Sequence, residues 1–270
     1  MYNKQTIRRR IALIAVAVTA LALTATNTLA APTTARQPKP TVVLVHGAFA
    51  DASTWNGVSD RLQRDGYPVI APANPLRGIA SDATYLASVL KTIPGPVVLV
   101  GHSYGGAVIG QAAAGLPSVK SLVFVDAFAL DVGEPAGSIG ERFPHNLLGP
   151  ALITRPYALP GGQTGTDVYV QPNRFRDVIG ADVPEHAIAL AAAAQRPVDQ
   201  SAFVEPPTAA AWKTIPSWFV IGRQDNAIDP AALRFMARRA HGHTTEIDAS
   251  HLGLISHADT VAQVIEHAAR

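Results

Sequence analysis

The chain of 270 residues contains no cysteine. This absence excludes disulfide bonds and a lipid anchor on an N-terminal cysteine, so the fold has to rely on its apolar core. Charged residues are few (16%), and neither sign is in marked excess, since the formal net charge is +2. Four basic residues fall in the first 30 positions, which leaves 18 basic and 20 acidic residues in the remainder. The composition therefore gives no indication of a surface for nucleic acids or anionic membranes.

The N-terminus lacks an apolar run long enough for a typical membrane span, which needs ~20 residues. Its run Ile11–Leu23 is interrupted by Thr19, follows the basic cluster Arg8–Arg10 and precedes the small residues around Ala30. This layout predicts a signal peptide over residues 1–30, of either the general secretory or the twin-arginine type. We therefore expect an exported protein, periplasmic or secreted, without a stable membrane anchor once the leader is removed. An uncleaved leader acting as an anchor is the alternative.

The rest of the chain shows the pattern of one α/β domain over residues 41–270, after a proline-rich, polar linker at 31–40. Apolar segments alternate with helical ones, and the predicted strands are apolar throughout. Such strands are typical of a mostly parallel sheet with helices on both faces. The predicted strands cover residues 41–45, 68–71, 97–100, 121–128, 217–221 and 244–248. The predicted helices cover residues 54–65, 81–93, 107–114, 230–240 and 258–269.

The alternation is interrupted from about residue 129 to residue 214, a segment rich in proline and glycine. An insertion of this size between strands is usually a cap over an active site, and we expect a helical one. Pro160-Gly161-Gly162 is expected to turn a small hairpin inside it. Helices are expected near 174–179 and 184–195.

A Gly-x-Ser-x-Gly motif, Gly101-His102-Ser103-Tyr104-Gly105, stands directly between the third predicted strand and a small-residue helix. This setting is required for a nucleophile elbow, in which a strained turn exposes the serine hydroxyl above the sheet. The N-terminus of the following helix points at the oxygen where negative charge would develop. Ser103 is therefore the predicted nucleophile, and His102 is expected to face away from the pocket.

A serine needs a base to take its proton and an acid to orient that base. Asp225 follows the predicted strand 217–221 and His251 follows the last strand, so both lie at the same sheet edge as Ser103. We predict Asp225 as the acid and His251 as the base. Asp126, near the end of the strand 121–128, is the rival acid; its alternative role is to bind backbone amides. Asp229, before Pro230, is predicted to be a helix cap.

The oxyanion of such a reaction needs two preorganised donors. We predict the backbone N–H of Tyr104 and that of Ala48 or Phe49, in the loop after the first strand. His46 is expected to fix this loop. Phe49, Tyr104 and Phe128 are the predicted pocket residues, although ordinary core packing explains aromatic residues equally well. No cofactor is predicted, and His241-Gly242-His243 alone is too little for a metal site.

Together, His46-Gly47-Ala48, the Gly-His-Ser-x-Gly-Gly run, the late aspartate and the final histidine resemble the α/β-hydrolase superfamily. The length, the cap and Trp55 resemble its compact branch of plant methylesterases and hydroxynitrile lyases. Lyases of that branch have a threonine and a lysine where this chain has Gly47 and Leu252. The resemblance therefore implies an esterase rather than a lyase, and Ser103 is unlike the aspartate nucleophile of haloalkane dehalogenases.

The predicted function is serine esterase activity on a small or medium hydrophobic carboxylic ester, through an acyl-enzyme on Ser103. Other reactions on the same triad stay open: hydrolysis of lactones, amides or carbon–carbon bonds, perhydrolysis of the haloperoxidase type, and hydroxynitrile lyase chemistry. A non-catalytic receptor for a small ligand is the alternative from a different class.

Overall fold

The computed structural model describes residues 38–270. The predicted signal peptide and most of the predicted linker lie outside the described residues. Within the described part of the chain, no helix is both long and apolar enough to cross a membrane.

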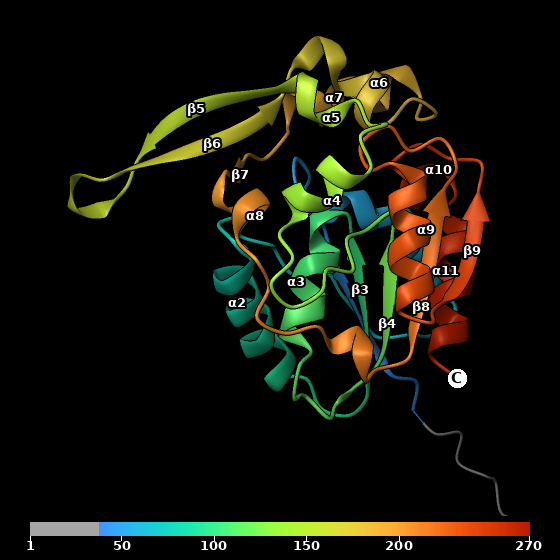
Figure 1. Ribbon diagram of the computed structural model, residues 1–270. Helices are drawn as coiled ribbons and strands as arrows, with labels where there is room; N and C mark the ends of the chain where they lie inside the picture. The colour runs from blue at the N-terminus through green and yellow to red at the C-terminus, as the bar shows by residue number, and fades with distance from the viewer. Residues whose placement is uncertain (1–37) are drawn as a thin grey trace, which may run out of the picture. The chain divides into compact units, whose positions relative to one another are not determined.

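A six-stranded parallel sheet forms the centre of this unit, in the order β2-β1-β3-β4-β8-β9 (Figure 1). The inner strands are apolar and almost entirely buried, which confirms the predicted α/β class. The strands are β1 (Thr41–Val45), β2 (Val69–Ile70), β3 (Val97–His102), β4 (Val119–Val125), β8 (Ser217–Gly222) and β9 (His243–Ile247).

Helices cover both faces of the sheet. In Figure 1, α2, α3 and α9 lie in front of the sheet and α11 lies behind it, where α1 packs against α11. These helices are α1 (Asn56–Arg64), α2 (Ile79–Lys91), α3 (Tyr104–Ala112), α9 (Pro230–Arg239), α10 (Gly253–Ser256) and α11 (Ala258–Ala268), with a 3₁₀ turn η1 at Ala52–Trp55. The helix predicted over residues 81–93 begins earlier, at Ile79, and the buried side chain of Asp82 within it accepts the backbone N–H of Arg77.

The segment between β4 and β8 contains helices and the hairpin expected at Pro160-Gly161-Gly162, together with a third strand that the sequence did not predict. It contains a three-stranded antiparallel sheet, β5-β6-β7, whose β5–β6 hairpin extends away from the main sheet (Figure 1). Gly161 and Gly162, both at φ 78°, make its turn. The strands are β5 (Leu152–Ala158), β6 (Thr164–Val170) and β7 (Val198–Asp199). The helices are α4 (Ala136–Arg142), α5 (Leu148–Ala151), α6 (Phe175–Ile179), α7 (Glu185–Ala193) and α8 (Ser201–Val204), with 3₁₀ turns η2 (Pro160–Gly162), η3 (Pro172–Arg174) and η4 (Ala211–Lys213).

Candidate active site

Ser103 stands on a strained turn between β3 and α3, with φ 52° and ψ −123°. Two glycines make the turn sterically possible. A Cβ at Gly101 would lie 2.6 Å from the carbonyl oxygen of Gly105, and a Cβ at Gly105 would lie 2.6 Å from that of Val45. The motif glycines are thus required because backbone segments approach each other here without room for side chains. The Ser103 carbonyl accepts hydrogen bonds from Gly106 and Phe128, which fixes the strained conformation.

Asp225 and His251 are brought together at the carboxyl edge of the sheet, from the loops after β8 and β9. The Nδ1 of His251 lies 2.7 Å from Oδ2 of Asp225, and both side chains are buried. The other carboxylate oxygen, Oδ1, accepts the amide N–H groups of Ala227 and Ile228 at 2.8 and 2.9 Å. With Nδ1–H donated to the carboxylate, the Nε2 of His251 is left free to accept a proton.

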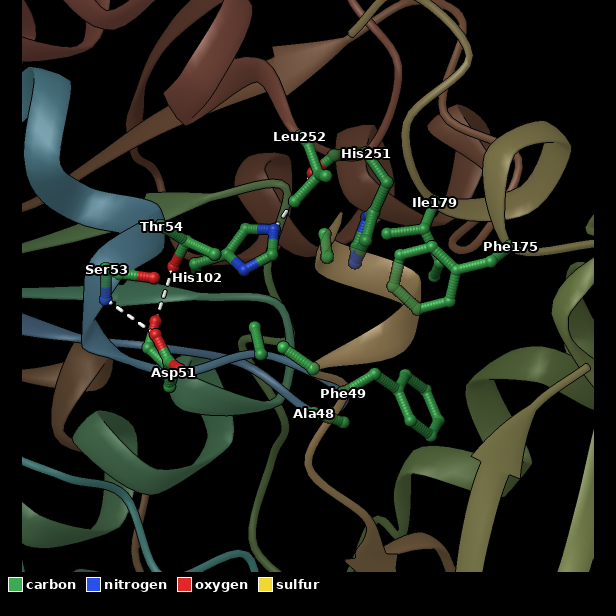
Figure 2. A pocket seen from close by; sticks show the side chains of 13 residues that line it. Ala48, Phe49, Asp51, Ser53, Thr54, His102, Phe175, Ile179, His251 and Leu252 are labelled. Atoms are coloured by element: carbon green, nitrogen blue, oxygen red, sulfur yellow. Dashed lines mark hydrogen bonds between the residues drawn. The ribbon is translucent and has the colours of Figure 1, made fainter. Parts of the chain in front are cut away.

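Two small cavities meet at His251. Both are also lined by Ala48 and Phe49, in the loop after β1. The first, of about 60 Å³, lies beside the loop after β1, and we call it the loop cavity (Figure 2). Its other walls include Phe175, Ile179, Ala191 and Leu252. The second, of about 20 Å³, is the serine cavity, lined by Ser103, Tyr104, Phe128, Ala136 and Leu148 among others. All three predicted pocket aromatics therefore line the cavity that contains Ser103.

The backbone N–H groups predicted as oxyanion donors border this cavity. The Tyr104 amide is the first of α3, so it has no carbonyl partner within its own helix. Phe49 takes a left-handed conformation (φ 63°), which turns the loop after β1. Within residues 38–270, the amides of Ala48 and Phe49 donate to no backbone carbonyl. These amides are thus free to donate to a substrate oxygen.

His46 fixes that loop. Its Nε2 accepts the backbone N–H of Asn74 at 2.9 Å, so Nδ1 carries the hydrogen and faces the carbonyl oxygen of Gly47 at 3.0 Å. The Asn74 side chain in turn donates to the His46 carbonyl. Burial lowers the pKa of His46, which keeps the ring neutral in this arrangement.

His102 does not face away from the site, as the sequence suggested, but lines the loop cavity (Figure 2). Its Nε2 lies 2.9 Å from the carbonyl oxygen of His251, so the ring donates to the backbone of the candidate base. The two rings are 4.8 Å apart. Burial keeps the pKa of His102 well below its usual value, and the uncharged ring avoids repelling a protonated His251.

Two further carboxylates support the site, and neither was predicted from the sequence. Asp82 accepts the hydroxyl of Tyr104 at 2.8 Å, which holds the residue that carries one oxyanion donor. Its place on the apolar face of α2, between Ile79 and Leu86, is a signal that could have revealed a buried carboxyl. Asp182 accepts the hydroxyl of Ser250, next to His251, and no local pattern predicts that contact.

Asp126, the other candidate for the acid, has the alternative role of binding a backbone amide. Its Oδ1 accepts the backbone N–H of Gly222 at 2.5 Å, and the residue is fully buried at φ 45°. It makes no contact with His251 comparable to that of Asp225. Burial, and then the charge of Asp225, raise the pKa of Asp126 well above its usual value. Asp229 caps α9 as expected, accepting the N–H of Ala231.

Because the folded state raises the pKa of Asp126, it holds a proton that the unfolded state has released. The stability contributed by this proton is complete below the unfolded pKa and is lost as the pH rises through the folded pKa. Asp126→Asn cannot lose a proton. We therefore expect the variant to gain stability relative to wild type as the pH rises from about 4, by at most about 1.4 kcal/mol per pH unit. Urea unfolding of both proteins between pH 4 and 8 measures this, and parallel pH profiles would contradict it.

The described residues contain no cluster of three or more His, Cys, Asp or Glu side chains placed to hold a metal ion. His243 begins β9 at the opposite edge of the sheet from Ser103 and stacks on Trp218. His257 directly precedes α11.

Known proteins resemble the chain over nearly all of its described length. An alpha/beta hydrolase nvfD of Aspergillus novofumigatus is 27% identical over 257 residues, which are 86% of this chain and 97% of that protein. Methylesterase 2 of Arabidopsis thaliana is 25% identical over 218 residues, 72% of this chain and 81% of its own. The crystal structure of polyneuridine aldehyde esterase has a TM-score of 0.74 at 20% identity and covers 85% of this chain and 98% of its own.

The profile of the alpha/beta hydrolase family matches residues 42–264, from β1 into α11. The match includes the loop after β1, the elbow and the loops that carry Asp225 and His251. The resemblance to the branch with plant methylesterases, inferred from the sequence, is confirmed. The chain belongs to the α/β-hydrolase family.

Proposed function

We propose that this protein is a carboxylic ester hydrolase that works through an acyl-enzyme on Ser103. One observation carries the proposal. His251, with Nδ1 on the Asp225 carboxylate at 2.7 Å, lines the same cavity as Ser103 on its strained turn. The relatives named as methylesterase and esterase support this reaction class.

In the first step, Nε2 of His251 takes the proton of the Ser103 hydroxyl while the serine oxygen attacks the ester carbonyl. The resulting oxyanion is held by the amides of Tyr104 and of Ala48 or Phe49. The protonated His251 then gives its proton to the alcohol oxygen as the carbon–oxygen bond breaks. A water molecule repeats the same sequence on the acyl-enzyme, releasing the acid and restoring the serine.

The walls of both cavities favour an ester with apolar groups. Phe128, Leu148 and Phe203 face the serine cavity, and Phe175 and Ile179 face the loop cavity. Leu252, directly after His251, is apolar and lines the loop cavity. It offers no charge that would hold a leaving cyanide, which favours ester hydrolysis over hydroxynitrile cleavage. The expected substrate is a small or medium hydrophobic carboxylic ester.

Presteady-state turnover of a nitrophenyl ester tests this proposal. We expect a burst of nitrophenol equal to the enzyme concentration if deacylation is slower than acylation, followed by many turnovers. A racemic cyanohydrin offered in parallel should release no cyanide. Cyanide release without ester turnover would show a lyase, and binding without multiple turnover would show a receptor.

Export is a separate proposal, based on the predicted leader at residues 1–30. The N-terminal sequence of the protein recovered outside the cytoplasm tests it, and a mature chain that begins close to residue 31 is the expected result.

A further inference from the structure

The serine cavity borders a much wider one. This outer cavity has a volume of about 300 Å³, against about 20 Å³ for the serine cavity. The two share five lining residues, which make a common wall: Phe128, Ala136, Leu148, Phe203 and Ala227. The loop cavity, in contrast, shares no lining residue with the outer cavity. The site therefore has two unequal arms.

The outer cavity lies between the inserted segment and the main domain. One wall is α4, which presents Ala136, Gly137 and Gly140, and the opposite wall is the start of α9 with Ile228 and Ala232. The small residues of α4 keep the space open. Of its lining residues on α4, Ala136 and Ile139 are buried, whereas Gly137 and Glu141 are exposed. The cavity thus has both buried and exposed residues in its wall.

The chemistry assigns the two parts of an ester to these arms. The acyl group stays on the Ser103 oxygen between the two steps, so it has to occupy the cavity that contains Ser103. The alcohol leaves with a proton from His251, which lines both the serine cavity and the loop cavity. Because the acyl group occupies the serine cavity, the loop cavity is left for the alcohol, and the acyl group extends from the serine cavity toward the outer cavity.

The shape of the serine and outer cavities determines which acyl groups they accept. Next to Ser103 the space is narrow, which excludes a branch on the carbon beside the carbonyl. Farther out it is wide and mostly apolar, so additional methylene groups leave water as the chain lengthens. The loop cavity is smaller than the outer cavity. In its wall, the Ser53 amide and the Thr54 hydroxyl both donate hydrogen bonds to Asp51 (Figure 2).

We propose that the serine and outer cavities together bind the acyl chain, and that the preferred substrates are esters of unbranched, apolar carboxylic acids with a small alcohol. This inference rests on the proposed ester hydrolase function. It assigns Gly140 and Ala136 as residues that determine acyl length, and Ala191 as a residue that limits the alcohol.

Gly140→Phe provides the sharpest test. A Cβ at Gly140 meets no atom within 4 Å, so the new ring can enter the outer cavity without displacing the chain. The substrates are methyl acetate, methyl octanoate, methyl 2-methyloctanoate and octyl acetate, followed by titration of the released acid. Wild type should favour methyl octanoate over the other three esters. In Gly140→Phe, kcat/KM for methyl octanoate should fall about tenfold or more, with methyl acetate unchanged.

Ala191→Phe is the matched variant in the other arm. It should lower activity on octyl acetate and leave methyl octanoate within about twofold. Ala136→Leu, at the wall shared by the serine and outer cavities, should lower kcat/KM for methyl octanoate and, because Ala136 also lines the serine cavity, for methyl acetate as well. Circular dichroism and thermal unfolding, which do not depend on activity, report whether each variant is folded.

Equal losses on methyl acetate and methyl octanoate in folded Gly140→Phe would overturn the assignment of the outer cavity. Loss of octyl acetate in Gly140→Phe, with methyl octanoate retained, would show that the arms are reversed. Failure of wild type to hydrolyse any of the four esters and the nitrophenyl ester would instead count against the proposed function.

Discussion

Ser103→Ala is expected to lower kcat for a nitrophenyl ester by roughly 10⁶-fold, because removal of a triad serine takes away the covalent route as a whole. The loss should not arise from unfolding. The serine side chain is small, and the turn is fixed by backbone hydrogen bonds from Gly106 and Phe128 to the Ser103 carbonyl, which alanine retains. The remaining activity over water should come from the oxyanion donors and from substrate binding.

The matched control is Ser88→Ala, on the exposed surface of α2, where the hydroxyl bonds only to the Thr84 carbonyl of its own helix. It should turn over the ester like wild type. Thermal unfolding of both variants separates a catalytic loss from a folding defect. A Ser103→Ala protein that is folded and retains more than a few per cent of the activity would eliminate the acyl-enzyme mechanism.

Asp225→Asn is expected to lower kcat by roughly 10⁴-fold, the cost of the wrong histidine tautomer. The structure gives the reason. Oδ1 of Asp225 accepts two backbone N–H groups, from Ala227 and Ile228, so the carbonyl oxygen of an asparagine has to take that place. Its NH₂ group then faces Nδ1 of His251 and forces the hydrogen onto Nε2. A histidine in that state cannot accept the proton of Ser103.

Comparison of Asp225→Asn with Asp126→Asn shows which of the two aspartates orients the catalytic histidine. Asp126 is buried, its pKa is raised, and its contact is the Gly222 amide rather than the histidine, so a neutral isostere should keep most of the activity. The ratio of the two kcat values, measured at one pH where both variants are folded, is the readout. A large loss in Asp126→Asn with Asp225→Asn close to wild type would reverse the assignment.

The elbow and the order of Ser103, Asp225 and His251 could be predicted because their determinants are local. Each residue follows a strand whose apolar run is visible in the sequence, and parallel strands place their carboxyl ends at one edge. The glycines at 101 and 105 are likewise explained by backbone contacts inside a short motif.

The inserted segment could not be predicted in the same way. Its strands β5 and β6 include exposed polar residues, and the pairing of β6 with β7 joins residues about 30 positions apart. The inward turn of His102 and the contact of Asp182 with Ser250 depend on how distant loops pack. The outer cavity also depends on this packing, since its walls come from both α4 and α9.

The most direct test of an acyl-enzyme on Ser103 is to identify the residue that carries the acyl group during turnover. The enzyme is mixed with a nitrophenyl ester, quenched in acid within the burst and digested, and the acylated peptide is sequenced by mass spectrometry. We predict one acyl group per chain on Ser103 in wild type and none in Ser103→Ala. In Ser88→Ala, the acyl group should accumulate on Ser103 as in wild type. An acyl group on any other residue, or ester turnover with no acyl-enzyme under conditions that give a burst, would contradict this prediction.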